Sequence, residues 1–407
     1  MNNELWNKQY AKFSAYGFLK NLRFFDAFFI LFLLEKGLSY TEIGILYAAR
    51  EIIINIVEVP SGFIADKYGR KNALIGSFLF YILSFSIFYL SESFWPFLLA
   101  FLSYGVADAF RSGTHKGMIM DYLKLNNWQS EKINYYGHTR AWSQKGSAIS
   151  SLIAGIIVFY SGSYQSIFLY SIVPYLINLL LILSYPQEIN LSKSPKKEQN
   201  LLTINSFFQV IKQPAVLSIM NTSALHSAYL KAVKDYIQPL MVSVALIIPI
   251  LVNVETDKKN GLLIGIFYFV IYLATSRASQ LAAKVAATNK NRISHQTLIA
   301  GFLFGIGLGL FYFYDVWVVA LLLFVGIYLI ENMRKPILTG FIADNVPNEM
   351  LVTVISVQSL ISTLITALLA LAFGITADAF GIGVAFMVVS AILLTSTLVS
   401  SQVLNDG

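Results

Sequence analysis

The chain of 407 residues contains no cysteine and few charged residues. Without cysteine it forms no disulfide and no thiolate metal site, and it has no thiol nucleophile. Asp, Glu, Lys and Arg make up 13% of the chain and hydrophobic residues 56%. A soluble domain has about twice that share of charge, so too few polar side chains are present to cover a water-soluble globule. The composition therefore excludes a soluble protein.

The sequence motifs of membrane-bound enzymes are missing as well. We find no H-E-x-x-H zinc motif, no G-x-S-x-G nucleophile motif, no paired-Asp metal motif and no nucleotide-binding loop. The sequence therefore predicts a protein that is not an enzyme and that uses no cofactor and no metal. The first residues also lack the features of a cleaved signal peptide, so we expect the first hydrophobic segment to remain as a membrane span.

Long hydrophobic stretches recur along the whole chain. A helix needs about 20 apolar residues to cross the bilayer, and twelve such stretches can be placed. The sequence thus predicts an all-α membrane protein. The predicted spans are residues 13–36, 41–65, 72–91, 95–122, 136–160 and 164–185 in the first half, and 214–250, 261–284, 293–313, 316–345, 350–374 and 380–402 in the second. Pro239 and Pro249 interrupt the long seventh stretch, which is expected either to be kinked or to be preceded by a surface helix.

One long polar segment, residues 187–205, lies in the middle of the chain. It predicts a linker between an N-terminal six-helix bundle, residues 1–186, and a C-terminal six-helix bundle, residues 206–407. The loops on the side of this linker carry most of the basic residues, whereas the opposite loops are short and poor in them. The positive-inside rule then places the linker and both termini in the cytoplasm, with the chain crossing the cell (inner) membrane.

Two segments about half a chain apart resemble each other. The matched pairs are Asp108 with Glu331, Arg111 with Arg334, Gly117 with Gly340, and Asp121 with Asp344. Each pair is 223 residues apart, and the two segments fall in the fourth and the tenth predicted span. The repeat indicates that the two bundles are pseudo-symmetric copies of one six-helix unit, a known way to build a transporter.

The loop between the second and third spans contains Gly62, Asp66, Gly69, Arg70 and Lys71. In this spacing it resembles the signature loop of the major facilitator superfamily, roughly G-x-x-x-D-x-x-G-R-[RK]. The resemblance implies that superfamily's twelve-helix fold, and it implies that the loop latches the two halves together on the cytoplasmic side. The residue types are consistent with this role. Gly62 permits another helix to approach closely, Gly69 permits a tight turn, and Asp66 can pair with Arg70.

Ionisable residues inside a span cost at least about 2.5–3.5 kcal/mol on insertion scales, so they usually face a cavity. Three carboxylates are predicted to carry the coupling proton, because a desolvated carboxylate binds protons more readily: Asp26, Glu51 and Asp108. Glu331 is a further candidate for this role. Cations outnumber acids in this inner set. The predicted substrate-binding residues are Arg111, His115, Lys234, Glu331 and Arg334. Arg111 and Arg334 at matching depth can bind a carboxylate or phosphate from the two halves.

These features predict a secondary active transporter that moves a small organic solute by alternating access. The excess of cations favours an anionic or zwitterionic solute, coupled to protons. The compact twelve spans resemble the exporter branch of the superfamily, which favours efflux by antiport. A divalent metal exporter, with His115 and Asp108 among its ligands, and a lipid or drug exporter are the alternatives. The expected partners are the solute, protons and the lipid bilayer, with no nucleic acid, and the chain is expected to be a monomer.

Overall fold

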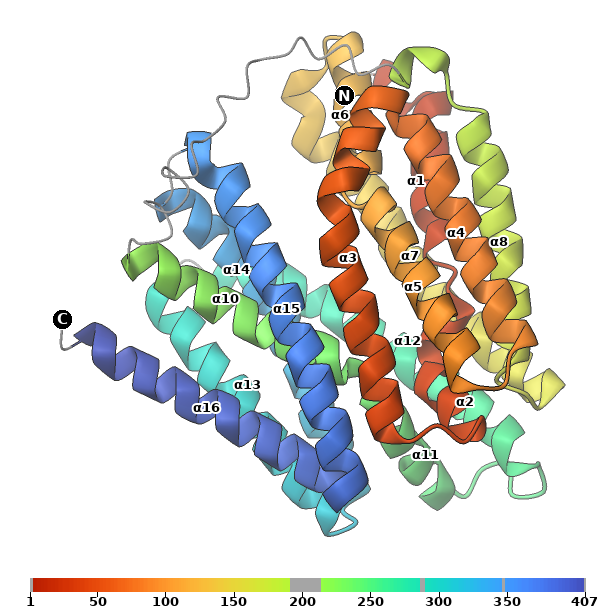
Figure 1. Ribbon diagram of the computed structural model, residues 1–407, viewed down its shortest axis with the longest axis vertical. Coiled ribbons are helices and arrows are strands. Elements are labelled where there is room, and N and C mark those ends of the chain that lie inside the picture. The colour runs from red at the N-terminus through yellow and green to blue at the C-terminus, as the bar shows by residue number, and fades with distance from the viewer. Residues whose placement is uncertain (1–2, 191–213, 286–289, 346–347, 406–407) are drawn as a thin grey trace. The chain divides into compact units, whose positions relative to one another are not determined.

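The computed structural model describes the backbone of residues 3–190, 214–285, 290–345 and 348–405. Within these ranges the side chains of residues 3–4, 133–134, 214–221, 279–285, 290–292, 294, 336, 339–345, 348–356 and 399–405 are not described. The regular elements of this part of the chain are all helices (Figure 1). Together they form the twelve-span all-α fold that the hydropathy pattern predicts.

Six spans come from the first half. They are α1 (Lys8–Lys20) with η2 (Phe24–Ala27) and α2 (Phe29–Glu35), α3 (Tyr40–Tyr68), α4 (Arg70–Leu90), α5 (Phe94–Arg111) with α6 (Thr114–Leu125), α7 (Lys132–Ser161) and α8 (Ser166–Leu183). Three short helical turns flank them: η1 (Asn3–Trp6), η3 (Gln129–Glu131) and η4 (Gln187–Ile189).

The second half supplies the other six spans. They are α10 (Pro214–Val233) with η5 (Lys234–Tyr236) and α11 (Ile237–Ile247), α12 (Thr256–Val285), α13 (Lys290–Phe313), α14 (Trp317–Asn345), α15 (Asn348–Phe380) and α16 (Ile382–Asn405). Within the described residues, six helices are long and apolar enough to cross a membrane on length and composition alone. Of the remaining spans, three are interrupted, α3 and α7 carry internal charges such as Arg50 and Glu51, and the described part of α16, Ile382–Leu398, is a shorter apolar helix.

Three spans are broken near their middle. The first is interrupted between α1 and α2, the fourth at Gly113, and the seventh at η5. Gly113 has a φ of 70°, a left-handed conformation that glycine adopts without steric cost. The break in the seventh span precedes Pro239, which lies in the first turn of α11, where a missing N–H leaves no hydrogen bond unmade. The expected proline kink is therefore replaced by a turn of 3-10 helix.

The helices form two compact units. Unit 1 comprises the described parts of residues 1–38, 49–194 and 248–272, and unit 2 those of residues 39–48, 195–247 and 273–407. Each unit thus takes most of its helices from one half of the chain and a short segment from the other. The predicted domain boundaries at residues 186 and 206 stay a prediction.

Aromatic rings fill the core of unit 1. Phe29 stacks on Phe101 with ring centroids 5.1 Å apart, and Phe88 stacks on Phe168 at 4.9 Å. These four rings come from α2, α4, α5 and α8 and are buried, so each contributes both burial and a favourable ring geometry. They fix the helices that carry the ionisable residues of this unit.

Unit 2 contains a close backbone contact between two of its helices. α16 packs along α13 (Figure 1), and a Cβ on Gly309 would collide with the carbonyl oxygen of Gly383. Without side chains at these two positions the helices come into direct backbone contact, as small residues allow in membranes.

Candidate functional site

The loop between α3 and α4 has the geometry that its sequence predicts at Gly69 and Arg70. Gly69 has a φ of 98°, which makes the turn between the two helices. Arg70 donates to Asp121 of α6 at 2.8 Å, whereas its distance to the exposed Asp66 is 3.9 Å. Asp121 is therefore its main partner. A Cβ on Gly62 would meet no atom of the described residues within 4 Å, so the expected close helix approach is not seen there.

Lys71 of the same loop is buried. Its ammonium group donates to the carbonyl oxygens of Leu183 and Tyr185 at 2.8 Å each. These carbonyls belong to the C-terminal end of α8, where the helix dipole favours a cation. Lys71 thus ties the loop to the chain that leads into the central linker, a contact that the sequence does not reveal.

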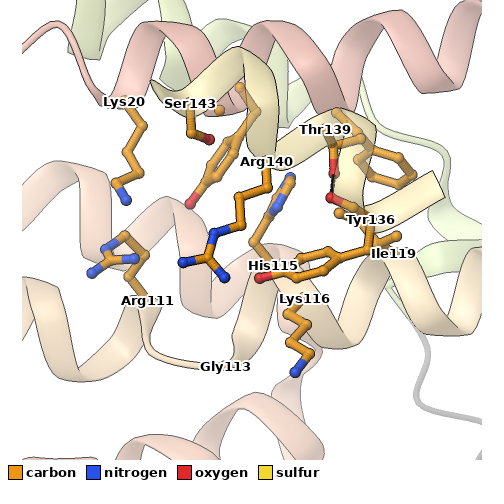
Figure 2. Close-up of a pocket in the computed structure, with 13 residues that line it drawn as sticks. Lys20, Arg111, Gly113, His115, Lys116, Ile119, Tyr136, Thr139, Arg140 and Ser143 are labelled. Atoms are coloured by element: carbon orange, nitrogen blue, oxygen red, sulfur yellow. Dashed lines mark hydrogen bonds between the residues drawn. The ribbon is translucent and has the colours of Figure 1, made fainter. Parts of the chain in front are cut away.

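A cavity of about 190 Å³ lies within unit 1 (Figure 2). The breaks in the first and fourth spans border it, and α1, α5, α6 and α7 supply its walls. Its lining residues are Phe13, Tyr16, Gly17, Lys20, Arg111, Gly113, His115, Lys116, Ile119, Tyr136, Thr139, Arg140 and Ser143. Two of the predicted substrate-binding residues, Arg111 and His115, are among them.

Four cationic side chains line this cavity: Lys20, Arg111, Lys116 and Arg140. In Figure 2 the side-chain nitrogens of Lys20, Arg111 and Arg140 face a common space, whereas Lys116 points away from it. Lys116 lies over the ring of Tyr136 at 5.4 Å. No carboxylate lines the cavity in the part of the chain that the structure describes. The cavity is therefore strongly positive.

Arg111 is held in place by Asp108 and Tyr81. Its guanidinium donates to the Asp108 carboxylate at 2.8 Å and to the Tyr81 hydroxyl at 2.9 Å. The Tyr81 hydroxyl in turn donates to Asp108 in a short hydrogen bond. Because Asp108 and Tyr81 fix one edge of the planar guanidinium, its remaining N–H groups are oriented for a ligand. Asp108, predicted to carry a proton, is placed here as the counter-ion of Arg111.

His115 stacks on Tyr16 with ring centroids 3.6 Å apart and an interplanar angle of 8°. Its Nε2 lies 3.2 Å from the hydroxyl of Tyr185. The ring is thus held on one face by Tyr16 and at its edge by Tyr185, and it forms part of the cavity wall. The sequence predicts His115 at this site but not its aromatic partner.

The other two predicted proton carriers also have arginine partners. Asp26 pairs with Arg23 at 2.8 Å in the break of the first span, and Glu51 pairs with the neighbouring Arg50 at 2.8 Å. Asp26 and Arg23 border a second, small cavity of about 10 Å³, a volume with room for about one water molecule. All three predicted carriers are therefore members of acid–arginine pairs.

The predicted site residues of the second half lie in unit 2 and have different partners. Glu331 pairs with His226 at 2.7 Å. Arg334 is 1% exposed and donates to the hydroxyl of Thr297 at 2.7 Å and to the carbonyl of Thr222 at 2.8 Å.

Lys234, the remaining predicted substrate residue, lies in η5, and its ammonium nitrogen is 3.5 Å from a carboxylate oxygen of Asp235. The other Asp235 oxygen accepts a 2.8 Å hydrogen bond from the hydroxyl of Tyr47. Lys234 is thus one member of a local ion pair at the break in the seventh span.

Sequence reasoning misses His226, Lys20 and Tyr16 as members of these sites, and it counts Arg140 among the cations inside the spans without predicting it to bind substrate. Of these residues, His226 could have been predicted from the sequence, because a histidine inside a predicted span is uncommon and marks a functional candidate. The repeat partners Gly340 and Asp344 lie outside the residues whose side chains are described. Among the described residues, no group of three or more His, Asp or Glu side chains could hold a metal ion.

Comparison with protein families gives one match that covers most of the chain. The model of the Major Facilitator Superfamily matches residues 21–370. A curated relative, the "Uncharacterized MFS-type transporter YxaM" of Bacillus subtilis (strain 168), is 24% identical over 388 residues, covering 91% of this chain and 89% of the relative.

Solved transporter structures share the fold at low identity. The nucleoside transporter NupG aligns with a TM-score of 0.77 at 12% identity, covering 97% of this chain and 99% of the other. A bacterial homologue of the lysosomal transporter Spinster, in an inward-facing and occupied conformation, gives 0.71 at 13%, covering 97% and 98%. A D-xylose–proton symporter gives 0.67 at 13%, covering 96% of both chains.

Proposed function

Because the chain belongs to the Major Facilitator Superfamily and is a membrane transporter of that type, we propose that it carries a small organic anion or zwitterion by alternating access. The observation that carries this proposal is the cavity of unit 1, which four cations and no described carboxylate line. Of these cations, Arg111 has its charge balanced by Asp108. Lys20, Lys116 and Arg140 have no carboxylate partner among the described residues and favour a negatively charged ligand.

The charge argument also gives the expected selectivity. At a separation of about 4 Å and an effective dielectric constant of about 20, two unit charges interact by about 4 kcal/mol. A cation in this cavity meets several repulsions of that order, and an anion meets attractions. The cavity is smaller than the roughly 300–1,000 Å³ of pockets for drug-sized ligands. It therefore fits a small solute or the anionic group of a larger one.

We further propose that transport is proton-coupled, and that it runs outward as antiport across the cell membrane with both termini in the cytoplasm. The support for coupling is a set of carboxylates inside the spans with basic partners: Asp26 and Asp108, which are partly exposed and pair with arginines, and the buried Glu331, which pairs with His226. One similar fold belongs to a D-xylose–proton symporter, which shows that the fold accommodates proton coupling.

Thermal unfolding of the purified full chain tests the anion proposal. The probes are inorganic phosphate, succinate, glutamate, tetraphenylphosphonium and Mn²⁺, each titrated at constant ionic strength. We expect phosphate, succinate or glutamate to raise the unfolding temperature, because these anions occupy the cationic cavity. Stabilisation only by tetraphenylphosphonium would favour a drug exporter, and stabilisation only by Mn²⁺ a metal exporter; either result contradicts the proposal.

A pair of lysine variants shows whether the cavity is responsible. Lys20→Gln removes a lining charge and is expected to weaken the stabilising anion at least about tenfold, equivalent to about 1.4 kcal/mol. Lys124→Gln removes an exposed charge on α6 that does not line the cavity and is expected to leave the affinity unchanged. Equal weakening in both variants would indicate a general surface effect and exclude the cavity as the binding site.

A further inference from the structure

Unit 2 contains an acid–histidine pair that is sealed from solvent. His226 of α10 and Glu331 of α14 approach to 2.7 Å between Nδ1 and a carboxylate oxygen, and their side chains are 0% and 4% exposed. Glu331 lies midway along α14 (Trp317–Asn345), a helix with a membrane-spanning apolar stretch. An ionisable pair at this depth is costly, so it is a functional candidate by default.

The surroundings of the imidazole leave one nitrogen unused. Phe302 and Tyr229 flank the ring, with centroids 6.0 Å and 6.4 Å away. Nε2 has no hydrogen-bond partner among the described residues and points at the backbone of Gly301, where a Cβ would collide with it. Since Nδ1 faces the carboxylate, the neutral ring donates there and keeps its lone pair on Nε2. That lone pair is available for a proton.

The charged and titratable groups around the pair are few. On α14, Arg334 and Lys335 follow Glu331, and the Lys335 nitrogen lies 3.8 Å from a Glu331 oxygen. On α10, the Tyr229 hydroxyl is hydrogen-bonded to Ser390 of α16 at 2.7 Å. The described neighbours from the other packed helices are neutral: Thr297 on α13, Ser390 on α16 and Gln358 on α15.

We propose that His226 and Glu331 form a proton-binding site in the second half of the chain. One proton from water binds at Nε2, and no other bond is formed or broken apart from the O–H bond of the donor. Uptake changes the summed charge of His226, Glu331 and Arg334 from zero to +1. A change of charge in this sealed environment favours a conformation that solvates or neutralises it, and so can couple a proton to the transport cycle.

This assignment differs from the acid–arginine pairs of unit 1. In those pairs a fixed guanidinium balances each carboxylate, and no neutral base is present. His226 supplies the base, Glu331 its orienting acceptor, and Gly301 the space for the ring. The role in transport rests on the proposed proton coupling, whereas proton binding itself can be measured without any solute.

Selective labelling of the histidine rings tests the proposal directly. The chain has four histidines, so ring carbon and nitrogen NMR signals of the full chain in detergent micelles can be assigned by single substitutions. We expect the signal lost in His226→Asn to titrate reversibly in the wild-type chain when the pH is varied. In Glu331→Gln its midpoint is expected to shift by about one pH unit or more, because the carboxylate partner is removed. His295→Asn serves as the matched control and should leave the His226 titration unchanged.

Gly301→Ala provides a variant that keeps both titrating groups. The added methyl group collides with the ring, so the His226 titration is expected to change, whereas Gly307→Ala on the same helix meets only the tip of Leu323 at 3.2 Å. A wild-type His226 signal that does not titrate, or one with the same midpoint in Glu331→Gln, overturns the proposal even if a variant misfolds. These measurements are made without solute. A negative result therefore does not contradict the anion proposal, and an absence of stabilisation by anions does not contradict proton binding at His226.

Discussion

The fourth and tenth spans carry the same acid-x-x-Arg spacing, yet the two copies use their charges differently. In α5, Asp108 and Arg111 pair with each other at 2.8 Å and are about a quarter exposed toward a cavity. In α14, Glu331 pairs with His226, and Arg334 donates to neutral oxygens in a sealed interior. Equal spacing in a repeat therefore preserves the position of a charge without preserving its partner.

The different partners of the two copies indicate which ligand each unit can bind. The pair in unit 1 leaves one edge of a guanidinium oriented toward a space that Lys20 and Arg140 also face, which suits recognition of an anion. The cluster in unit 2 has a neutral base with a spare lone pair and almost fully buried side chains, which suits a proton. On this comparison, solute recognition and proton binding are assigned to different copies of one ancestral segment.

The largest expected effects come from replacing Arg111 and Arg334, because these two arginines have different partners in the two units. Arg334→Ala leaves a buried void, and Thr297 and the Thr222 carbonyl lose a charged donor, so we expect a loss of about 3–5 kcal/mol in the free energy of unfolding. Arg111→Ala should cost only about 1–2 kcal/mol, because its side chain is 26% exposed and Tyr81 still donates to Asp108. Thermal unfolding in detergent, followed by tryptophan fluorescence, measures both.

The anion response should show the opposite order. Arg111→Ala is expected to abolish stabilisation by the anion, and any folded fraction of Arg334→Ala should retain it. Arg277→Ala, which removes an exposed arginine of α12, controls for the loss of a positive charge. If Arg334→Ala is as stable as Arg111→Ala, the sealed interior assigned to unit 2 is wrong.

Replacing one tyrosine in each unit, Tyr81 or Tyr229, is expected to have a smaller effect. Tyr81→Phe removes the hydroxyl that bonds both Asp108 and Arg111, and we expect anion affinity to fall about five- to tenfold, since one hydrogen bond contributes about 1 kcal/mol. Tyr229→Phe removes the bond to Ser390 in unit 2 and should cost a similar amount of stability without changing anion affinity. Calorimetric titration with the stabilising anion distinguishes the two, and equal effects on affinity would contradict the division of roles.

The sequence predicts the spans well because a helix that crosses the bilayer needs a long, largely apolar stretch, and it predicts the Gly69 turn because only glycine adopts that conformation cheaply. The site is predicted less completely. Arg111 and His115 follow from their depth in a span, but which face of a helix meets a cavity depends on packing that no single span encodes. The pairing of His226 with Glu331 joins residues 105 positions apart, and nothing in the local pattern of α10 indicates it.

The smallest effect is expected at Lys335, and it tests how sealed the pair in unit 2 is. Its side chain is 59% exposed, and its nitrogen lies 3.8 Å from Glu331, compared with 2.7 Å for His226. An exposed pair at that distance contributes about 0–1 kcal/mol, so Lys335→Gln should change the free energy of unfolding by about 0.5 kcal/mol or less. A double-mutant cycle with Glu331→Gln measures the coupling directly. A coupling above about 2 kcal/mol would mean that Lys335, rather than His226, is the main partner of Glu331, and the proton would then have to be assigned to a lysine–carboxylate pair.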